Sequence, residues 1–272
     1  TMFMEAVRYL AQRAGIDIEV GNDFHKSSTW AERQLIQRLH EVLLATPAAL
    51  DYVTKTRGWQ LATVRSARLG FMPQDKRKLL ADLNLPDKWR DVIAKFPAGM
   101  IVYVHLERGR LVYLSGRSIE GKRHYNPPRE ILGERRPYYN HLYSSDAERA
   151  VLVEGQADAI TFGEWGIPAL AIAGMHLSDE LLTALRQHRR LFVALDNTPD
   201  AMEKNRDIAR MLGATAFIPR LPDGVKDAND WLVQGNASAD VVQDVLNKAR
   251  TWLQSEIERV AFLVGLERKD AV

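Results

Sequence analysis

The sequence contains no cysteine, and none of its 272 residues belongs to an apolar run long enough to cross a bilayer. The absence of cysteine excludes disulfide bonds and cysteine-ligated zinc within this chain. There is also no signal-peptide pattern, so we expect a cytoplasmic protein without membrane contact. Hydrophobic residues make up 46% and charged residues 26% of the chain, which is typical of a globular protein with one large domain or two modest ones.

Net charge is also small, at +2, but the charges are unevenly distributed. Residues 55–90 carry nine Lys and Arg against three Asp and Glu, and residues 107–136 carry eight against four. Residues 144–240 have the opposite bias, with nine basic against fifteen acidic residues. A basic half joined to an acidic half suits a protein that holds a polyanion on one part and metal ions on the other. Two ordinary surfaces of opposite bias are the alternative.

An apolar run that ends in a carboxylate is the centre of the acidic half. Residues 151–153 (Val-Leu-Val) predict a short buried strand, and Glu154 and Gly155 follow it directly. Gly155 permits a sharp turn, after which Asp158 lies in the first turn of a predicted helix. Open α/β sheets place their chemistry at the carboxyl ends of such strands. A poorly solvated acid at this position needs a cation, a metal or a proton as partner.

Two further apolar runs lead into acidic segments. Residues 191–195 are followed by Asp196-Asn197-Thr198-Pro199-Asp200, and residues 215–221 lead to a loop that contains Lys226-Asp227. Polar residues at the end of a single strand are common. Three successive strands that each end in an acidic segment, the first with the Glu-Gly-x-x-Asp spacing, are much less common by chance. Three strands that deliver carboxylates to one sheet edge predict an oxygen cluster suited to Mg²⁺ or Mn²⁺.

The remaining pattern predicts a mixed α/β chain. Strands are expected at 151–153, 169–173, 191–195 and 215–220, alternating with helices at 157–165, 178–188 and 201–212, which indicates a small parallel sheet flanked by helices. Residues 239–266 predict one long closing helix. Upstream, the pattern predicts helices at 3–14, 29–44 and 48–54, two short helices between 79 and 96, and a hairpin over 100–115 that turns at Arg108-Gly109.

The three acidic motifs together resemble the TOPRIM domain of DnaG-type DNA primases. Three motifs show the resemblance: Glu154-Gly155-x-x-Asp158, the strand that ends at Asp196, and Lys226-Asp227-x-Asn229. The sequence of the third motif is most similar to that of phage primase–helicases. It extends upstream through Arg57-Gly58, residues 69–73, Gly116-Arg117 and residues 122–128. It implies a TOPRIM Rossmann-like parallel sheet, preceded by a basic mixed α/β lobe and followed by a terminal helix.

The resemblance also implies a division of the chain. Residues 1–24 would be a helix and linker that follow an amino-terminal zinc module absent from this sequence, and residues 25–145 would be the basic lobe. Residues 146–235 would be the TOPRIM domain, and residues 236–272 a helical segment. The implied reaction is template-directed synthesis of short RNA primers from nucleoside triphosphates on single-stranded DNA. It would proceed by two-metal transfer with Mg²⁺ or Mn²⁺. A replicative helicase would be a partner through regions outside this chain.

The resemblance assigns a role to individual residues. The catalytic residues would be Glu154, Asp158 and Asp196, and the metal ligands Glu154, Asp196, Asp227 and, as a substitute, Asp200. Nucleotide or DNA would contact Arg117, Lys122, Arg123, Asn126 and Lys226. The family's second motif is usually Asp-x-Asp, whereas here Thr198 replaces the second aspartate by a weaker hydroxyl ligand. Two alternatives therefore stay open: a TOPRIM nuclease that uses the same ions, and a non-catalytic nucleic-acid-binding module with an altered metal site.

Overall fold

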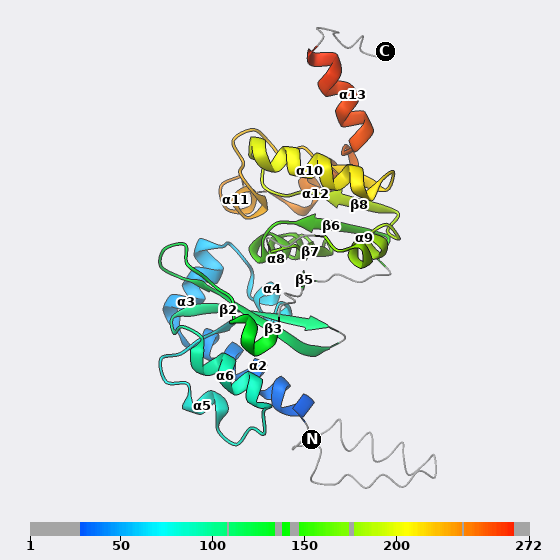
Figure 1. The fold of residues 1–272 in the computed structure, drawn as a ribbon. Helices are drawn as coiled ribbons and strands as arrows, with labels where there is room; N and C mark the ends of the chain where they lie inside the picture. Colours follow the sequence, from blue (N-terminus) through cyan, green and yellow to red (C-terminus); the bar gives the residue numbers. More distant parts are fainter. Residues whose placement is uncertain are drawn as a thin grey trace, which may run out of the picture.

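The computed structural model describes residues 28–107, 109–133, 138–141, 147–173, 177–235 and 237–263. The helix expected over residues 3–14 lies outside these ranges. The described chain forms two lobes, one above the other, each built on its own sheet (Figure 1). None of the described helices is both long and apolar enough to cross a membrane.

The N-terminal lobe is built on an antiparallel sheet. Its strand order is β1 (Gly70–Phe71), β2 (Met100–Glu107), β3 (Arg110–Ser118) and β4 (His124–Tyr125), so the predicted hairpin is confirmed. A Cβ on Gly70 would lie 2.7 Å from the Leu39 Cβ, so only glycine lets β1 approach the first described helix this closely. The helices of this lobe are α2 (Ser28–Ala45), α3 (Pro47–Asp51), the π-helix η2 (Tyr52–Thr56), α4 (Leu61–Ser66), α5 (Arg77–Leu80), α6 (Asp87–Lys95) and α7 (Arg129–Leu132).

The two faces of strand β2 serve different cores, because successive side chains of a strand point to opposite faces. Val102 and Val104 pack in the core formed with α2 and α6. Tyr103 and His105 point the other way, and both rings contact Tyr139, with centroid distances of 5.9 and 5.1 Å. The hairpin thus lies between α2 and the second lobe.

The C-terminal lobe is built on a six-stranded sheet. Its order is β10 (Arg250–Thr251), β9 (Ala216–Ile218), β8 (Arg190–Val193), β6 (Arg149–Val153), β7 (Ala169–Ala171) and β5 (Tyr139–His141). The four central strands are parallel, as predicted, whereas the two edge strands run antiparallel to their neighbours. One face of the sheet packs on α8 (Gln156–Glu164), α11 (Ala228–Val233) and α12 (Ala239–Asn247), the other on α9 (Asp179–Leu185) and α10 (Pro199–Leu212).

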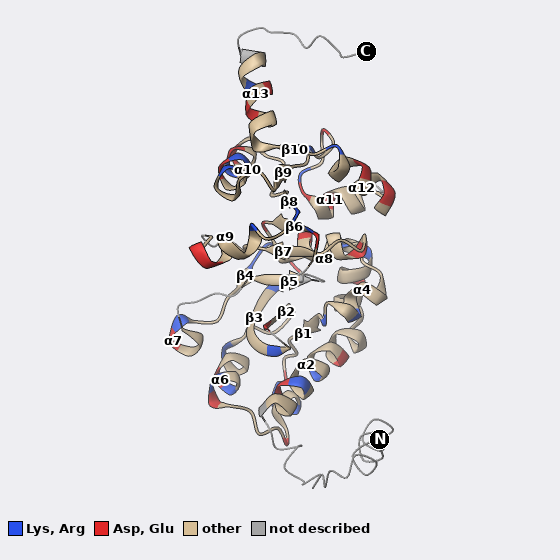
Figure 2. Cartoon of the chain, turned by 90° about the vertical axis from the view of Figure 1, so that its right-hand side faces the viewer, with Lys and Arg blue, Asp and Glu red and all other residues tan. Residues whose placement is uncertain are grey.

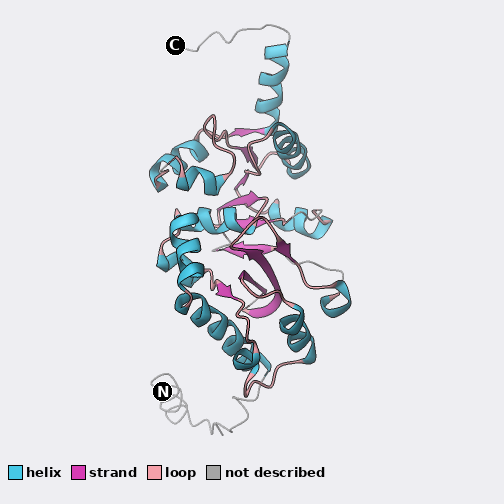
Figure 3. Cartoon of the chain, turned by 90° about the vertical axis from the view of Figure 1, so that its left-hand side faces the viewer, coloured by secondary structure: helices cyan, strands magenta, loops and turns pink. Residues whose placement is uncertain are grey.

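The prediction of a single helix over residues 239–266 is wrong. Helix α12 ends at Asn247, residues Arg250 and Thr251 form β10, and a second helix, α13 (Trp252–Leu263), then leads away from the lobe (Figures 1 and 3). Arg250 and Thr251 pair with Ile218 and Phe217, which requires extended backbone between the helices. Helical periodicity alone does not signal this interruption, because the strand is only two residues long.

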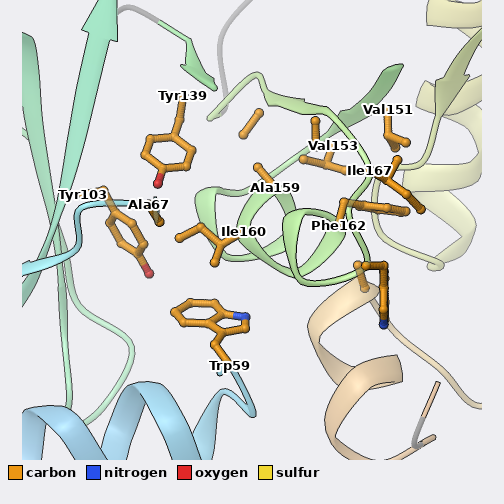
Figure 4. Close-up of a cluster of buried hydrophobic side chains, with 14 of the residues drawn as sticks. Trp59, Ala67, Tyr103, Tyr139, Val151, Val153, Ala159, Ile160, Phe162 and Ile167 are labelled. Atoms are coloured by element: carbon orange, nitrogen blue, oxygen red, sulfur yellow. The ribbon is translucent and has the colours of Figure 1, made fainter. Parts of the chain in front are cut away.

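The two lobes share a hydrophobic core (Figure 4). Trp59 and Tyr103 of the N-terminal lobe and Ile160 of α8 are almost completely buried in it. The Trp59 indole Nε1 also donates a hydrogen bond of 3.0 Å to the Thr161 hydroxyl. The burial of apolar surface between the lobes stabilises the arrangement in which they face each other.

Candidate active site between the lobes

A cavity of about 360 Å³ lies between the lobes and is lined by residues of both. Its C-terminal wall carries four carboxylates, and its N-terminal wall carries basic and polar side chains of β3, β4 and the segment after it. Lys and Arg are spread over the N-terminal lobe, which faces the strand ends that bear the carboxylates (Figure 2). The residues concerned are Glu154, Asp158, Asp196 and Asp227 on one side, and Arg117, His124 and Asn126 on the other.

Each carboxylate is positioned by the end of a strand or the start of a helix. Glu154 follows β6, and Gly155 is the N-cap of α8. Asp196 follows the apolar run that contains β8. Asp227 is the N-cap of α11, where its Oδ1 accepts a 2.8 Å hydrogen bond from the Asp230 amide. The parallel arrangement of β6 and β8 brings these groups to one edge of the sheet, as predicted.

Asp158 is the most buried of the four carboxylates, with 9% of its surface exposed. Its Oδ1 accepts a hydrogen bond of 3.4 Å from the Asn229 amide. Burial raises the pKa of Asp158 to about 7, and the neighbouring carboxylates of Asp227 and Asp196 contribute to the rise. The cluster therefore concentrates more negative charge than the nearby side chains neutralise.

Lys226 lies between two members of the cluster. Its Nζ is 3.3 Å from the Asp196 Oδ2 and 3.5 Å from the Asp227 Oδ2. The Asp196 carboxylate raises the pKa of Lys226, so the ammonium form is favoured here. Because 61% of the lysine side chain is exposed, these ion pairs are weak and exchangeable. The ammonium thus takes a place between carboxylates that another cation can occupy.

Asn197 connects the second and third acidic loops. Its backbone amide donates a 2.6 Å hydrogen bond to the Lys226 carbonyl, and its Nδ2 donates one of 2.9 Å to the Val225 carbonyl. The residue after Asp196 therefore keeps Asp196 and Asp227 in register with each other.

On the opposite wall, Arg117 and His124 form a polar pair across the register of β3 and β4. The Arg117 Nη1 lies 3.1 Å from the His124 Nε2, and arginine can only donate, so this histidine nitrogen accepts. Burial and the Arg117 charge lower the pKa of His124, which keeps the ring neutral at pH 7. The Arg117 Nε and the Tyr125 hydroxyl are buried and have no hydrogen-bond partner in the described structure. This wall therefore presents a guanidinium and a neutral histidine to the cavity.

The cavity brings together most, but not all, of the residues singled out from the sequence. Glu154, Asp158, Asp196, Asp227, Lys226, Arg117 and Asn126 line it. Lys122 and Arg123 are exposed and do not. Thr198 and Asp200 are also outside its lining: the Thr198 Oγ1 accepts a 3.3 Å hydrogen bond from the Ala201 amide as N-cap of α10, and Asp200 is exposed in the first turn of that helix.

Comparison with known proteins agrees with this geometry. Residues 151–232 match the Toprim-like family. The chain is 28% identical over 270 residues to the DNA primase of Geobacillus stearothermophilus, covering 85% of this chain and 45% of that relative. The zinc-binding and RNA polymerase domains of Aquifex aeolicus primase superpose with a TM-score of 0.69 at 20% identity, over 91% of this chain and 67% of the other. The chain has the fold of a DnaG-type primase catalytic core.

A second primase structure extends the comparison to a complex. A DnaG primase catalytic domain bound to single-stranded DNA matches with a TM-score of 0.60 and 19% identity, over 84% of this chain and 83% of that one. The chain spans less than half the length of the G. stearothermophilus primase. The fold expected from the three acidic motifs is thereby confirmed.

The residues present in this primase fold suit a divalent ion of the Mg²⁺ type. Mg²⁺ is held by one or two carboxylates together with waters and substrate phosphates, and seldom by a cage of protein ligands. Asp196 and Asp227 already flank one cation, the Lys226 ammonium. Within the described ranges, no three acidic or histidine side chains converge closely enough to hold a metal alone. Substrate phosphates or water would have to complete the coordination.

Sequence reasoning missed several residues that line this cavity. Tyr103, Ser115, His124 and Gln156 all take part, and the Ser115 hydroxyl lies 2.9 Å from the His105 Nε2 and accepts a 3.3 Å bond from the Gln156 Nε2. His124 follows Arg123 in the chain and pairs with Arg117 in the sheet. Strand alternation would have identified Ser115 as sharing a face with Arg117, but the pairing of β4 with β3 carries no clear sequence signal.

Proposed function

We propose that this chain is the catalytic core of a DNA primase, which synthesises short RNA primers from nucleoside triphosphates on a single-stranded DNA template. The observation that carries the proposal is the cavity between the lobes. It combines the carboxylates of a Toprim-like domain with Arg117 of a basic lobe. Acidic groups for metal ions and donors for phosphates are what nucleotidyl transfer requires.

In the proposed reaction, the 3′-hydroxyl of the growing RNA attacks the α-phosphorus of a nucleoside triphosphate, and diphosphate leaves. Divalent ions, when bound, would neutralise charge on the attacking and leaving oxygens. Glu154, Asp196 and Asp227 would hold them, because these residues line the cavity from three different loops. Glu154, half-buried beside the cavity, is also placed to accept the hydroxyl proton.

The opposite wall would hold the triphosphate. Arg117 lines the cavity, and its Nη1 contacts a neutral histidine and not a carboxylate, so its charge is available to a phosphate oxygen. When a divalent ion displaces Lys226 from Asp196 and Asp227, the lysine ammonium would bind a phosphate oxygen of the substrate instead. Asp158 would be a positioning residue, because it is buried and bonded to the Asn229 amide.

Single-stranded DNA is the proposed template, and the basic N-terminal lobe is its proposed contact surface. Residues 55–90 and 107–136 are rich in Lys and Arg, which attract a phosphate backbone. Lys122 and Arg123 are exposed next to β4, which forms part of the cavity wall, and are placed to contact the DNA template. A replicative helicase is a proposed partner through regions outside this chain.

Primer synthesis on single-stranded templates with labelled nucleotides and Mg²⁺ or Mn²⁺ tests the proposal. Extension of a preformed primer should be run in parallel, since initiation can depend on a module outside this chain. Glu154→Gln and Asp196→Asn should each abolish product. Asp200→Asn is the matched control, because Asp200 is exposed and outside the cavity, and it should retain activity.

Two outcomes would reject the proposal. Cleavage of the template in place of synthesis would assign the cavity to a nuclease. DNA binding without any product in either assay would assign it to a non-catalytic module.

A further inference from the structure

A second cavity, of about 610 Å³, lies on the N-terminal lobe. It is bordered by α2, by the chain that connects α4 to β1, and by the turn end of the β2–β3 hairpin. It has no lining residue in common with the cavity that holds the carboxylates. Any ligand here would therefore bind separately from the proposed primase chemistry.

The charged side chains that line this second cavity are all basic among its described residues. Arg33 comes from α2, Arg65 from the last turn of α4, and Arg68 from the turn before β1. All three are exposed, and among the described residues no side-chain hydrogen bond or ion pair engages any of their guanidinium groups. Arg38, one turn along α2 from Arg33, differs: its Nη1 donates to three carbonyl oxygens, including that of Ala81 at 2.6 Å.

The backbone that presents these arginines is tightly held. The His40 Nδ1 donates a 2.7 Å hydrogen bond to the Leu69 carbonyl, which ties α2 to the residue after Arg68. Arg68 itself has a φ of 50° and directly follows the C-cap of α4. Its amide donates a hydrogen bond to the Arg65 carbonyl, and the Leu69 amide donates one to the Val64 carbonyl. This left-handed residue closes the helix and fixes the backbone that carries Arg65 and Arg68.

The rest of the lining is partly apolar. Ile36 and Leu44 of α2 and Leu106 of β2 contribute to it. A cavity of this volume matches small-molecule sites, and it joins three free guanidiniums to an aliphatic surface. Guanidinium groups bind phosphate in a bidentate manner, and aliphatic side chains accept the flat face of a base.

We propose that this cavity binds a phosphorylated nucleotide, with the phosphates on Arg33, Arg65 and Arg68 and the base on the apolar residues. The nucleotide comes either free or as the 5′-phosphorylated end of a nucleic-acid strand, since both carry the same chemistry. The proposal does not depend on the catalytic assignment.

Titration calorimetry with ATP in EDTA tests this binding, because chelation removes the divalent ions that the carboxylate cavity requires. The protein carries Asp196→Asn and Arg117→Ala throughout, so that binding at the carboxylate cavity does not contribute. In this background, Arg33→Ala with Arg65→Ala should weaken ATP binding at least tenfold. Lys204→Ala, which removes an exposed basic residue of α10 outside this cavity, should leave the affinity unchanged.

A second variant protects the test against misfolding. Arg68→Gly removes a proposed phosphate ligand while it relieves the left-handed backbone, so it should weaken ATP binding without lowering the melting temperature. A 5′-phosphorylated oligonucleotide and its 5′-hydroxyl counterpart form the second arm. Preference for the phosphorylated strand over ATP identifies a strand end as the ligand, and equal or tighter ATP binding identifies a free nucleotide. No binding of either ligand, or equal affinity in the wild-type and arginine-variant cavities, would overturn the proposal.

Discussion

Arg57 and Asn229, 172 residues apart in the chain, hold each other by two hydrogen bonds in opposite directions. The Arg57 Nη1 donates to the Asn229 Oδ1 at 2.8 Å, and the Asn229 Nδ2 donates to the Arg57 carbonyl at 2.9 Å. Arg57 also donates to the Tyr52 hydroxyl, while the Asn229 amide donates to Asp158. The pair connects the N-terminal lobe directly to the segment that carries the third acidic motif.

Removal of Arg57 should destabilise the protein. Arg57→Ala leaves the buried Asn229 side chain without its charged partner, and we expect a loss of ~2–3 kcal/mol in the free energy of unfolding. Urea denaturation of Arg57→Ala, Asn229→Ala and the double variant gives the coupling energy of the pair, which should exceed about 0.5 kcal/mol. Strictly additive losses would contradict a direct interaction. Arg129→Ala is the matched surface control.

The buried carboxylate predicts a pH-dependent stability. The pKa of Asp158 is about 7 in the folded chain against 3.8 for the ordinary group, so ionisation opposes folding. Its contribution to stability is full below pH 3.8 and is lost as the pH rises through 7. In EDTA, Asp158→Asn should therefore be more stable than wild type at pH 8, by on the order of 2–4 kcal/mol. The two proteins should be equally stable near pH 4.

Urea denaturation at several pH values checks this crossover. Asp200→Asn, an exposed carboxylate in the first turn of α10, should show no such pH-dependent difference. Parallel stability curves for Asp158→Asn and wild type would rule out a raised pKa at Asp158.

Lys226 should compete with divalent ions for Asp196 and Asp227. Lys226→Met removes the ammonium that lies between these carboxylates, so Mn²⁺ should bind several-fold more tightly in the absence of nucleotide. Calorimetric titration of Mn²⁺ measures the change, with Lys204→Met, an exposed substitution on α10, as control. Equal or weaker Mn²⁺ binding by Lys226→Met would show that the ammonium does not occupy the ion's place.

Thr198 should contribute to stability but not to metal binding. Its hydroxyl accepts the Ala201 amide as an N-cap, and loss of such a cap costs about 1 kcal/mol. Thr198→Ala should therefore lower the free energy of unfolding by this amount and leave Mn²⁺ affinity unchanged. Thr198→Asp, which can cap equally well, should restore stability. A drop in Mn²⁺ affinity in Thr198→Ala would make the hydroxyl a ligand after all.

The central part of the fold was predictable because its signals are local. Short segments were enough to predict the strands at 151–153 and 191–195 and the helix that begins near residue 178. In the structure the Ser178 hydroxyl caps this helix by accepting the Leu181 amide. The position of the carboxylates was then also predictable, because the carboxyl ends of parallel strands meet at one edge of the sheet. The edge strands β5 and β10 were missed, since two or three residues carry no periodicity and only the neighbouring strand defines them.

The candidate site was predictable only on its acidic side. Glu154, Asp158, Asp196 and Asp227 belong to motifs, whereas His124 and Tyr125 enter the cavity through the pairing of β4 with β3. Arg57 was recognised only as part of an Arg-Gly stretch. Its contact with Asn229 depends on the packing of two lobes, which no local pattern encodes.

The distance along the chain between Arg57 and Asn229 has a consequence for the order in which the protein folds during synthesis. The N-terminal lobe leaves the ribosome first, and its Trp59 and Tyr103 face a surface that does not yet exist. Contacts of such long sequence separation form slowly, because closing the loop costs entropy before the contact contributes. We therefore expect the cavity between the lobes to be the last part of the molecule to form. Aggregation is most favoured before that point, while the apolar surface of the N-terminal lobe is still uncovered.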